Sequence, residues 1–291
     1  MEIINRICWN ITNKCNDGCQ FCFRQKNSNE LPYQMQKKVI DILVNLGINH
    51  ITFSGGEALL CKSIFKIIDY AYQKGFSVNL ITNGKLLNRE NVSRISGKVQ
   101  IISLPIDVCD NEMIEDVNNI GRSNGHNDII EKQLALLESF PDISIKINTV
   151  ITKLNFNELI PIYYKFIHNN PQIKIWNLFE FTDLRGSSID NKEKFSLSPK
   201  LFKEIKESFL NYKKNGLFRN DLSIRIKSKE TICGSYLVLS PNGDFVLKQG
   251  VEEEKIIGNI FDRNIRCLLN NINFDLIRYT KRLKNKALII V

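Results

Sequence analysis

Three cysteines lie close together near the start of the 291-residue chain, at Cys15, Cys19 and Cys22. They are spaced C-x3-C-x2-C, and thiolates are soft ligands that suit iron–sulfur clusters or zinc. Three thiolates can bind three irons of a four-iron cluster, which leaves the fourth iron open to a substrate or cofactor. The loop that carries them, residues 12–23, is called the cysteine loop below. It predicts a metal site with one free coordination position.

There are two alternatives to an iron–sulfur site: a zinc site, or three cysteines that lie close together by chance. A structural zinc site needs a fourth ligand at matched spacing, usually from a Cys or His pair. The three histidines are His50, His126 and His168, and no two of them form such a pair. We therefore expect an iron–sulfur cluster.

Short β-rich runs and longer amphipathic runs alternate along the chain. Six β–α units in series predict a parallel sheet covered by helices, with right-handed crossovers. Because six units are too few for a closed eight-fold barrel, the expected fold class is α/β, an open partial (β/α)6 barrel. Strands are expected at residues 7–11, 48–53, 77–81, 99–104, 143–151 and 173–181, and helices at 34–46, 64–74, 89–95, 129–137, 157–168 and 199–211.

The pattern changes beyond residue 220. Short strands are expected at 222–226, 235–239 and 244–247, with a Pro-Asn-Gly-Asp turn between the last two. A helix is expected over 264–283. We therefore predict two domains: a partial barrel at residues 1–220, and a small C-terminal β-hairpin and helix module at 221–291 rather than a seventh unit.

The composition is ordinary for a soluble globular protein, with 43% hydrophobic and 24% charged residues. There is no signal-peptide stretch and no window near the ~18 apolar residues of a membrane span. We expect a cytoplasmic protein without a membrane partner, in which the eight cysteines form no structural disulfides and the closely clustered ones indicate metal or redox chemistry. The charge of +9 suits an anionic substrate, although lysines on exposed helix faces are the simpler explanation. No basic run with interleaved aromatics indicates a nucleic-acid partner.

The cysteine loop resembles that of the radical SAM superfamily, which has C-x3-C-x2-C after the first strand and an aromatic residue, here Phe21, before the last cysteine. The resemblance implies a [4Fe–4S] cluster on Cys15, Cys19 and Cys22, with S-adenosylmethionine on the open iron. One electron from the cluster cleaves S-adenosylmethionine to a 5′-deoxyadenosyl radical, which abstracts hydrogen from the substrate. It also implies oxygen sensitivity and an electron donor of the flavodoxin or ferredoxin type.

A second motif, Ser54-Gly55-Gly56-Glu57, follows the second expected strand. Taken alone, a Gly-Gly pair there is an ordinary turn. In this position it is similar to the GGE motif of the superfamily. The resemblance implies that the glycines admit the methionyl part of the cofactor and that Glu57 accepts a hydrogen bond from its ammonium group.

Four more residues are cofactor contacts by the same resemblance. Asn83 and Ser103 end the third and fourth strands, where open α/β sheets bind ligands. Arg122 would hold the cofactor's carboxylate, a task that suits a guanidinium, as in the branch that includes viperin and GTP 3′,8-cyclase. Asn148 is an amide in an otherwise apolar strand. Each of three residues also has a simpler explanation. Asn83 could belong to an ordinary turn, Arg122 could lie on a solvated face, and Asn148 could be a core asparagine with its hydrogen bonds satisfied.

The C-terminal module is similar to the SPASM/twitch extensions of peptide-modifying members, whose cysteines bind auxiliary clusters. Lys248 stands where a cysteine would be expected, and only Cys233 and Cys267 remain. Two thiolates fall short of the four that a fully ligated cluster needs. We therefore expect no auxiliary cluster, and identity with GTP 3′,8-cyclase is disfavoured.

The expected function is radical SAM catalysis on an unidentified substrate, with a viperin-like nucleotide or a peptide as the leading options. Arg185 is a candidate substrate contact, and no catalytic residue is assigned. The alternative is a non-catalytic iron–sulfur or zinc protein used for binding or sensing. The joint presence of Glu57, Ser103 and Arg122 argues against it, because an inert protein has no use for a cofactor-binding rim.

Overall fold

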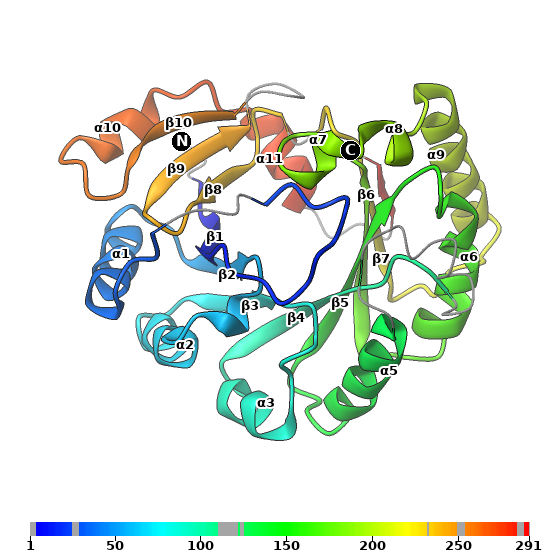
Figure 1. Cartoon of the computed structure of the whole chain (residues 1–291), viewed down its shortest axis with the longest axis horizontal. Helices are drawn as coiled ribbons and strands as arrows, with labels where there is room; N and C mark the ends of the chain where they lie inside the picture. Colours follow the sequence, from blue (N-terminus) through cyan, green and yellow to red (C-terminus); the bar gives the residue numbers. More distant parts are fainter. Residues whose placement is uncertain are drawn as a thin grey trace.

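The computed structural model describes residues 4–24, 29–109, 122, 125–231, 233–248, 254–283 and 288–290. An 11-stranded sheet runs through them in the order β10-β9-β8-β1-β2-β3-β4-β5-β6-β7-β11 (Figure 1). Its strands are β1 (Arg6–Thr12), β2 (His50–Gly55), β3 (Ser77–Ile81), β4 (Val99–Pro105), β5 (Ser144–Ile151), β6 (Ile173–Glu180), β7 (Ser223–Lys227), β8 (Leu237–Leu239), β9 (Asp244–Lys248), β10 (Glu254–Asn259) and β11 (Leu288–Ile290).

Parallel pairing dominates this sheet. Neighbouring strands from β1 to β7 are all parallel, β8 joins β1 in parallel, and β9 and β10 pair antiparallel. The predicted α/β class with a parallel sheet is confirmed, and so is the hairpin made by β8 and β9.

Two details of the C-terminal prediction were wrong. The strand predicted at 222–226 is β7, which pairs in parallel with β6 and extends the main sheet. The single predicted helix is two helices, α10 (Ile265–Asn270) and α11 (Leu276–Leu283). Between them the backbone of Asp275 donates to the Gly234 carbonyl at 2.7 Å instead of continuing the helix. The division between residues 220 and 221 stays a prediction, and the sheet is continuous on both sides of it.

Helices cover the outer face of the sheet (Figure 1). Each buries a stripe of apolar residues at helical spacing, as α1 does with Val39, Ile40 and Leu43. The helix predicted at 157–168 includes a π-helical turn, η4, in which His168 N donates to Tyr163 O at 2.7 Å. The longer helices are α1 (Tyr33–Asn45), α2 (Ile64–Gln73), α3 (Arg89–Ile95), α5 (His126–Leu137) and α9 (Pro199–Lys214), and the shorter ones are η1 (Ala58–Leu60), η3 (Phe156–Glu158), α6 (Leu159–Ile162), η4 (Tyr163–Ile167), α7 (Ser187–Asp190) and α8 (Lys192–Phe195).

The other face of the sheet is polar, which is unusual for parallel strands because these are mostly apolar on both faces. Along β5, Ile145 and Ile147 are buried under the helices, whereas Lys146 and Asn148 point to the opposite face. Lys146 interacts electrostatically with Cys8 on β1, although β2, β3 and β4 lie between these strands in the sheet. The sheet therefore curls around its polar side, which we call the inner face.

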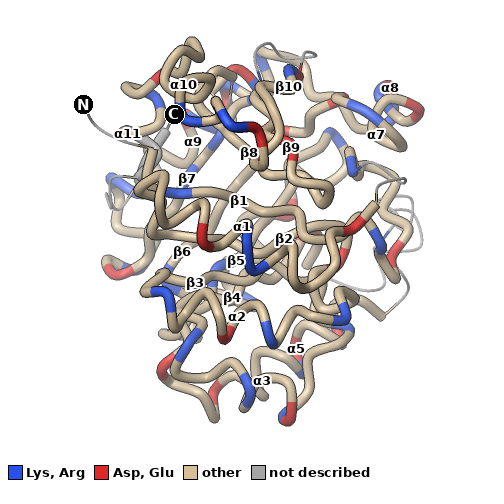
Figure 2. Tube along the Cα trace, turned by 90° about the vertical axis from the view of Figure 1, so that its left-hand side faces the viewer, with Lys and Arg blue, Asp and Glu red and all other residues tan. Residues whose placement is uncertain are grey.

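Charges are mixed on the outside of the molecule. Figure 2 shows Lys and Arg interspersed with Asp and Glu on one side of the chain, so the net charge of +9 does not gather there into one basic patch. No helix within the described ranges is long and apolar enough to cross a bilayer.

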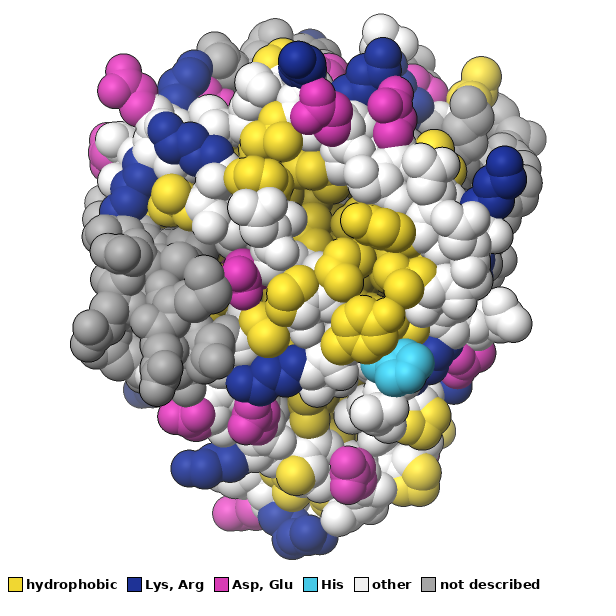
Figure 3. All heavy atoms as spheres, turned by 90° about the vertical axis from the view of Figure 1, so that its right-hand side faces the viewer, with side chains coloured by type: hydrophobic (Ala, Val, Ile, Leu, Met, Phe, Trp, Pro, Cys, Tyr) yellow, Lys and Arg dark blue, Asp and Glu magenta, His cyan; other side chains and the backbone are white. Residues whose placement is uncertain are grey.

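Aromatic side chains pack together where η4 meets α9, and Figure 3 shows hydrophobic side chains gathered at the surface on this side of the molecule. The buried Tyr163 ring packs on Phe218 at 5.0 Å, and Tyr212 packs on Phe218 at 6.2 Å. Behind them, Trp176 of β6 lies 5.8 Å from Phe209 of α9. These contacts fix α9 on the outer face of the sheet.

The first prediction concerns this core. Trp9 of β1 is fully buried, with its ring 5.9 Å from that of Phe53. We expect Trp9→Ala to lower the free energy of unfolding by about 3–5 kcal/mol, because it removes buried contacts and leaves a cavity. Urea denaturation measures the change, with Tyr72→Ala, at a position that is 49% exposed, as the control. A loss below about 1 kcal/mol for Trp9→Ala would contradict the packing described.

Candidate functional site

The cysteine loop leaves the end of β1 and packs directly against the turn that follows β2. Gly56 N donates to Thr12 O at 2.8 Å, and Glu57 N donates to Lys14 O at 2.8 Å. A Cβ at Gly55 would lie 2.2 Å from Thr12 O, and one at Gly56 would lie 2.3 Å from Lys14 O. The glycines are therefore required by backbone-to-backbone contact between the two predicted motifs. Their predicted contact with the methionyl part of the cofactor stays a prediction.

Glu57 is 1% exposed and accepts three hydrogen bonds from within the chain. Its donors are Thr82 Oγ1 at 2.8 Å, Asn83 N at 2.6 Å and Leu59 N at 3.0 Å. Burial raises the pKa of the Glu57 carboxyl, and these hydrogen bonds oppose the rise. The carboxylate thus fixes the turn after β3 beside the cysteine loop. Its predicted contact with the cofactor's ammonium group stays a prediction.

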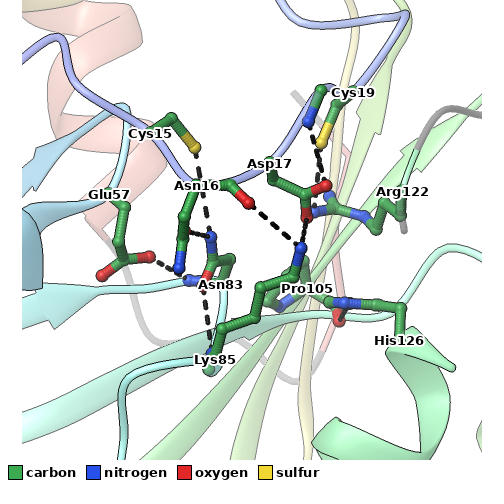
Figure 4. Close-up of polar contacts among 12 residues, drawn as sticks. Cys15, Asn16, Asp17, Cys19, Glu57, Asn83, Lys85, Pro105, Arg122 and His126 are labelled. Atoms are coloured by element: carbon green, nitrogen blue, oxygen red, sulfur yellow. Dashed lines mark hydrogen bonds and ion pairs between the residues drawn. The ribbon is translucent and has the colours of Figure 1, made fainter. Parts of the chain in front are cut away.

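The turn after β3 reaches the cysteine loop itself (Figure 4). Asn83 Nδ2 donates to Asn16 Oδ1 at 2.7 Å. Two residues on, Lys85 Nζ donates to the Asn16 carbonyl at 3.3 Å and lies 3.2 Å from Asp17 Oδ2. The predicted Asn83 therefore lies at the site, together with Asn16, Asp17 and Lys85, which the sequence did not single out.

Arg122 approaches the loop from the opposite side (Figure 4). Its Nε lies 2.5 Å from Asp107 Oδ2, and its guanidinium lies 5.2 Å from the centre of the Phe21 ring. Burial alone would lower the pKa of Arg122, but the charge of Asp107 outweighs it and raises the pKa. Arg122 is thus at the predicted site as a permanent cation. Its predicted contact with the cofactor's carboxylate stays a prediction.

His126 begins α5 behind this arginine and is 2% exposed. Its Nε2 lies 3.2 Å from the Pro105 carbonyl. Burial and the Arg122 charge lower the pKa of His126 to about 4, so the ring is neutral at pH 7. Among the residues that the structure describes, Arg122 is therefore the fixed cation on this side of the site.

Each of the three predicted ligand sulfurs faces an N–H donor. Cys15 Sγ lies 4.0 Å from Asn83 Nδ2, Cys19 Sγ 3.7 Å from Arg122 Nη1, and Cys22 Sγ 3.4 Å from the backbone N of Arg24. Hydrogen bonds to sulfur are one of the ways in which a protein sets the potential of an iron–sulfur cluster. The three N–H groups that face these sulfurs therefore fit a cluster bound by the thiolates of Cys15, Cys19 and Cys22.

Burial is the main cause that raises the pKa of the Cys15 thiol and raises that of the Cys19 thiol to about 12. The Asp17 charge contributes to the rise in both. Among the described residues, no group of three or more His, Cys, Asp or Glu is placed to hold a single metal ion. A four-iron cluster takes one thiolate per iron, so its cysteines do not have to meet at one point.

The remaining predicted residues lie on or beside the inner face. Ser103 is fully buried, and its Oγ has no hydrogen-bond partner in the described part of the chain. Asn148 Oδ1 accepts from Asn177 Nδ2 at 2.9 Å. Ser54 hydrogen-bonds to the thiol of Cys8. A buried hydroxyl without a partner is rare unless a ligand or water supplies one. Ser103 therefore fits the predicted cofactor contact, which stays a prediction.

Two cations on the inner face were missed by the sequence reasoning. They are Lys146 on β5 and Arg225 on β7. Burial is the main cause that lowers the pKa of Lys146 to about 8, and the Arg225 charge lowers it further. Both residues alternate with isoleucines in their strands, and this alternation could have indicated a polar inner face.

The other residues singled out from the sequence lie beside the site. Arg185 Nε donates to the Phe23 carbonyl at 2.6 Å, and Arg185 also forms an ion pair with Glu254 of β10. Lys248 is 4% exposed, and its ammonium has no hydrogen-bond partner among the residues described. Cys233 donates to the Lys229 carbonyl at 3.2 Å. Arg185 thus connects the end of the cysteine loop to β10.

A second prediction tests the contact between the two motifs. Gly56→Ala places a Cβ against the Lys14 carbonyl, so the cysteine loop must move away at a cost of about 1–3 kcal/mol. We expect less iron per chain after anaerobic reconstitution, measured by iron analysis and cluster absorbance, with Cys19→Ala as the low reference. Gly18→Ala is the matched control, because a Cβ there meets nothing within 4 Å. Equal iron content in Gly56→Ala and Gly18→Ala would contradict the prediction.

Comparison with known proteins gives relatives over most of the chain. An S-adenosylmethionine-dependent nucleotide dehydratase of Selenomonas ruminantium is 26% identical over 283 residues, which cover 94% of this chain and 96% of that protein. A GTP 3′,8-cyclase of Staphylococcus carnosus is 24% identical over 212 residues, which cover 68% of this chain and 60% of the cyclase.

Solved structures share the fold. The structure of native anSMEcpe with bound AdoMet and Kp18Cys peptide matches with a TM-score of 0.71 at 17% identity. The match covers 96% of this chain and 86% of the anSMEcpe chain. Streptococcus suis SuiB bound to its precursor peptide SuiA also has a TM-score of 0.71, at 14% identity, covering 96% of this chain and 66% of SuiB.

The family model of the radical SAM superfamily matches residues 9–163, from the middle of β1 to the start of η4. This match includes the cysteine loop, the Gly-Gly turn docked on it, and Arg122. Because it spans more than half of the 291 residues, the chain belongs to the radical SAM superfamily, as an enzyme whose cofactors are a [4Fe–4S] cluster and S-adenosylmethionine.

Proposed function

We propose that this enzyme acts on a nucleotide whose phosphates bind Lys146 and Arg225 on the inner face of the sheet. The observation that carries the proposal is that two like charges are placed near each other on a buried face. The Arg225 charge lowers the pKa of Lys146, so each cation disfavours the other. Lys146 donates no hydrogen bond to any residue in the described ranges, so an anion on the inner face would relieve its charge.

The relatives favour the same substrate class. The nucleotide dehydratase of Selenomonas ruminantium aligns over nearly the whole of both chains, including the C-terminal hairpin region. The structures bound to peptides share the fold at 14% and 17% identity, which does not identify a substrate. The dehydration of a nucleotide is therefore the proposed reaction class, and a peptide substrate has less support.

We propose Cys15, Cys19 and Cys22 as the cluster ligands. When bound, the cluster supplies the electron that cleaves S-adenosylmethionine and so yields a hydrogen-abstracting radical. The chain's own groups hold and orient the cofactor. Arg122 offers a fixed cation for a carboxylate, and Ser103 and Asn148 offer polar groups on the inner face.

The electron reaches the cluster from a donor protein, which we propose to be of the flavodoxin or ferredoxin type. The net charge of +9 suits an acidic protein partner, because opposite charges steer the encounter of two proteins.

A third prediction tests the substrate class. With reconstituted enzyme, dithionite and S-adenosylmethionine, we expect deuterium from ribose-deuterated CTP, or from another ribose-deuterated nucleoside triphosphate, to appear in 5′-deoxyadenosine. Mass spectrometry of the product gives the result, and Cys19→Ala is the inactive reference. If loaded enzyme forms 5′-deoxyadenosine but takes up no deuterium from any of the four ribonucleotides, the nucleotide proposal is wrong.

A fourth prediction concerns pH. The pKa of Lys146 is lowered to about 8, so its charge is present below pH 8 and is lost above it. If this charge holds a phosphate, the Kd of CTP rises about tenfold between pH 7.5 and pH 9. Calorimetry on the enzyme with S-adenosylmethionine measures it.

Lys146→Arg keeps its charge throughout this range and should flatten the pH dependence. Lys174→Met is the control for the loss of a lysine elsewhere, since the Lys174 side chain is 47% exposed and pairs with Asp221. A Kd that rises equally in the wild type and in Lys146→Arg would contradict the prediction.

A further inference from the structure

A carboxylate is buried inside the cysteine loop. Asp17 lies between Cys15 and Cys19 in the sequence, and its side chain is only 2% exposed. Its Oδ1 accepts from Gly18 N at 3.0 Å. A buried charge is costly unless it is paired and hydrogen-bonded. The position is unfavourable for a second reason, because a cluster on these cysteines would bring further negative charge close to Asp17.

Lys85 is placed to compensate this charge (Figure 4). Its Nζ lies 3.2 Å from Asp17 Oδ2, and its side chain is 15% exposed. The ammonium also donates to the Asn16 carbonyl at 3.3 Å, so it is held by two groups of the cysteine loop. An ion pair that is shielded in this way is screened less by salt than a surface pair.

The backbone around Lys85 is fixed from the other side. Asn83 N and Thr82 Oγ1 donate to Glu57 at 2.6 Å and 2.8 Å, and Asn83 Oδ1 accepts from Lys85 N at 3.0 Å. Gly84 adopts a positive φ of 85°, which turns the chain between Asn83 and Lys85. The lysine therefore starts from a rigid turn, and its side chain has little freedom to leave Asp17.

We infer that Lys85 is a positioning residue that neutralises Asp17 within the cysteine loop and thereby makes the bound cluster easier to reduce. Reduction adds one negative charge to the cluster, and the reduction potential depends on the net charge and the hydrogen bonds around it. Asp17 is two residues from both Cys15 and Cys19, and its buried carboxylate lies within the loop that carries them, so its charge is near the proposed cluster. Without Lys85, that charge would oppose the entry of the electron.

This inference rests on the proposed cluster ligands and not on the substrate. It concerns the enzyme before any substrate binds. A failure of the nucleotide proposal therefore leaves it intact, and the reverse also holds.

The experiment is a charge-pair cycle on the reconstituted full-length enzyme without substrate. The variants are Lys85→Met, Asp17→Asn and the double variant, with Lys85→Arg as the conservative replacement. Lys174→Met is the matched control, because it removes a lysine from an exposed ion pair with Asp221. Iron per chain is measured first, and the midpoint potential of the cluster is then obtained by redox titration followed by electron paramagnetic resonance.

We expect Lys85→Met to disfavour reduction by about tenfold in the equilibrium constant, which is 59 mV for a one-electron couple. Asp17→Asn should shift the potential upward, the double variant should return close to the wild type, and Lys85→Arg should retain the wild-type potential. Equal potentials in Lys85→Met and Lys174→Met would overturn the inference. So would a Lys85→Met protein that takes up no iron where Lys174→Met loads fully, since Lys85 would then hold the loop rather than set the potential.

Discussion

The contact between two backbones, at the end of β1 and at the end of β2, is the constraint on which the site depends. The Cβ positions of Gly55 and Gly56 would lie 2.2 and 2.3 Å from carbonyl oxygens of the cysteine loop, so no other residue type fits without a shift. This contact places the three cysteines directly over the inner face. It also directs Glu57 into the protein, where its carboxylate holds the turn after β3. A cluster bound by these cysteines and the substrate that we propose on the inner face would then be neighbours.

Buried charges around the cysteine loop are compensated one by one by elements that are distant in sequence. Asp107 pairs with Arg122 at 2.5 Å, and Asp17 pairs with Lys85 at 3.2 Å. A buried charge is tolerated when a partner is fixed in place, and here the turn after β3 and the residue Arg122 provide such partners. Lys146 differs, because the charge with the largest effect on its pKa is the like charge of Arg225. This uncompensated position is what favours an anionic substrate there.

Because the sheet curls, its polar inner face is turned toward the space in which we propose that the substrate binds. A parallel sheet with helices on one side needs only one apolar face, provided that the other is turned toward a ligand or water. The strands β5 and β7 meet this condition by placing isoleucines outward and Lys146, Asn148 and Arg225 inward. The hairpin of β8 and β9 then extends the edge at β1, and Arg185 links the cysteine loop to β10.

The sequence by itself determined the cluster ligands proposed, the Gly-Gly turn and most strands, because short spacings and alternation are local properties. Asn83 and Ser103 could be named because the ends of parallel strands gather at one edge of a sheet, whereas Arg122 could be named only from the family resemblance. Only the tertiary structure decided that β7 extends the main sheet, that Lys85 meets Asp17, and that Lys146 meets Cys8 and Arg225. The two residues of each of these side-chain pairs are at least 68 positions apart in the sequence. Their meeting depends on how far the sheet curls, and no local pattern encodes that curvature.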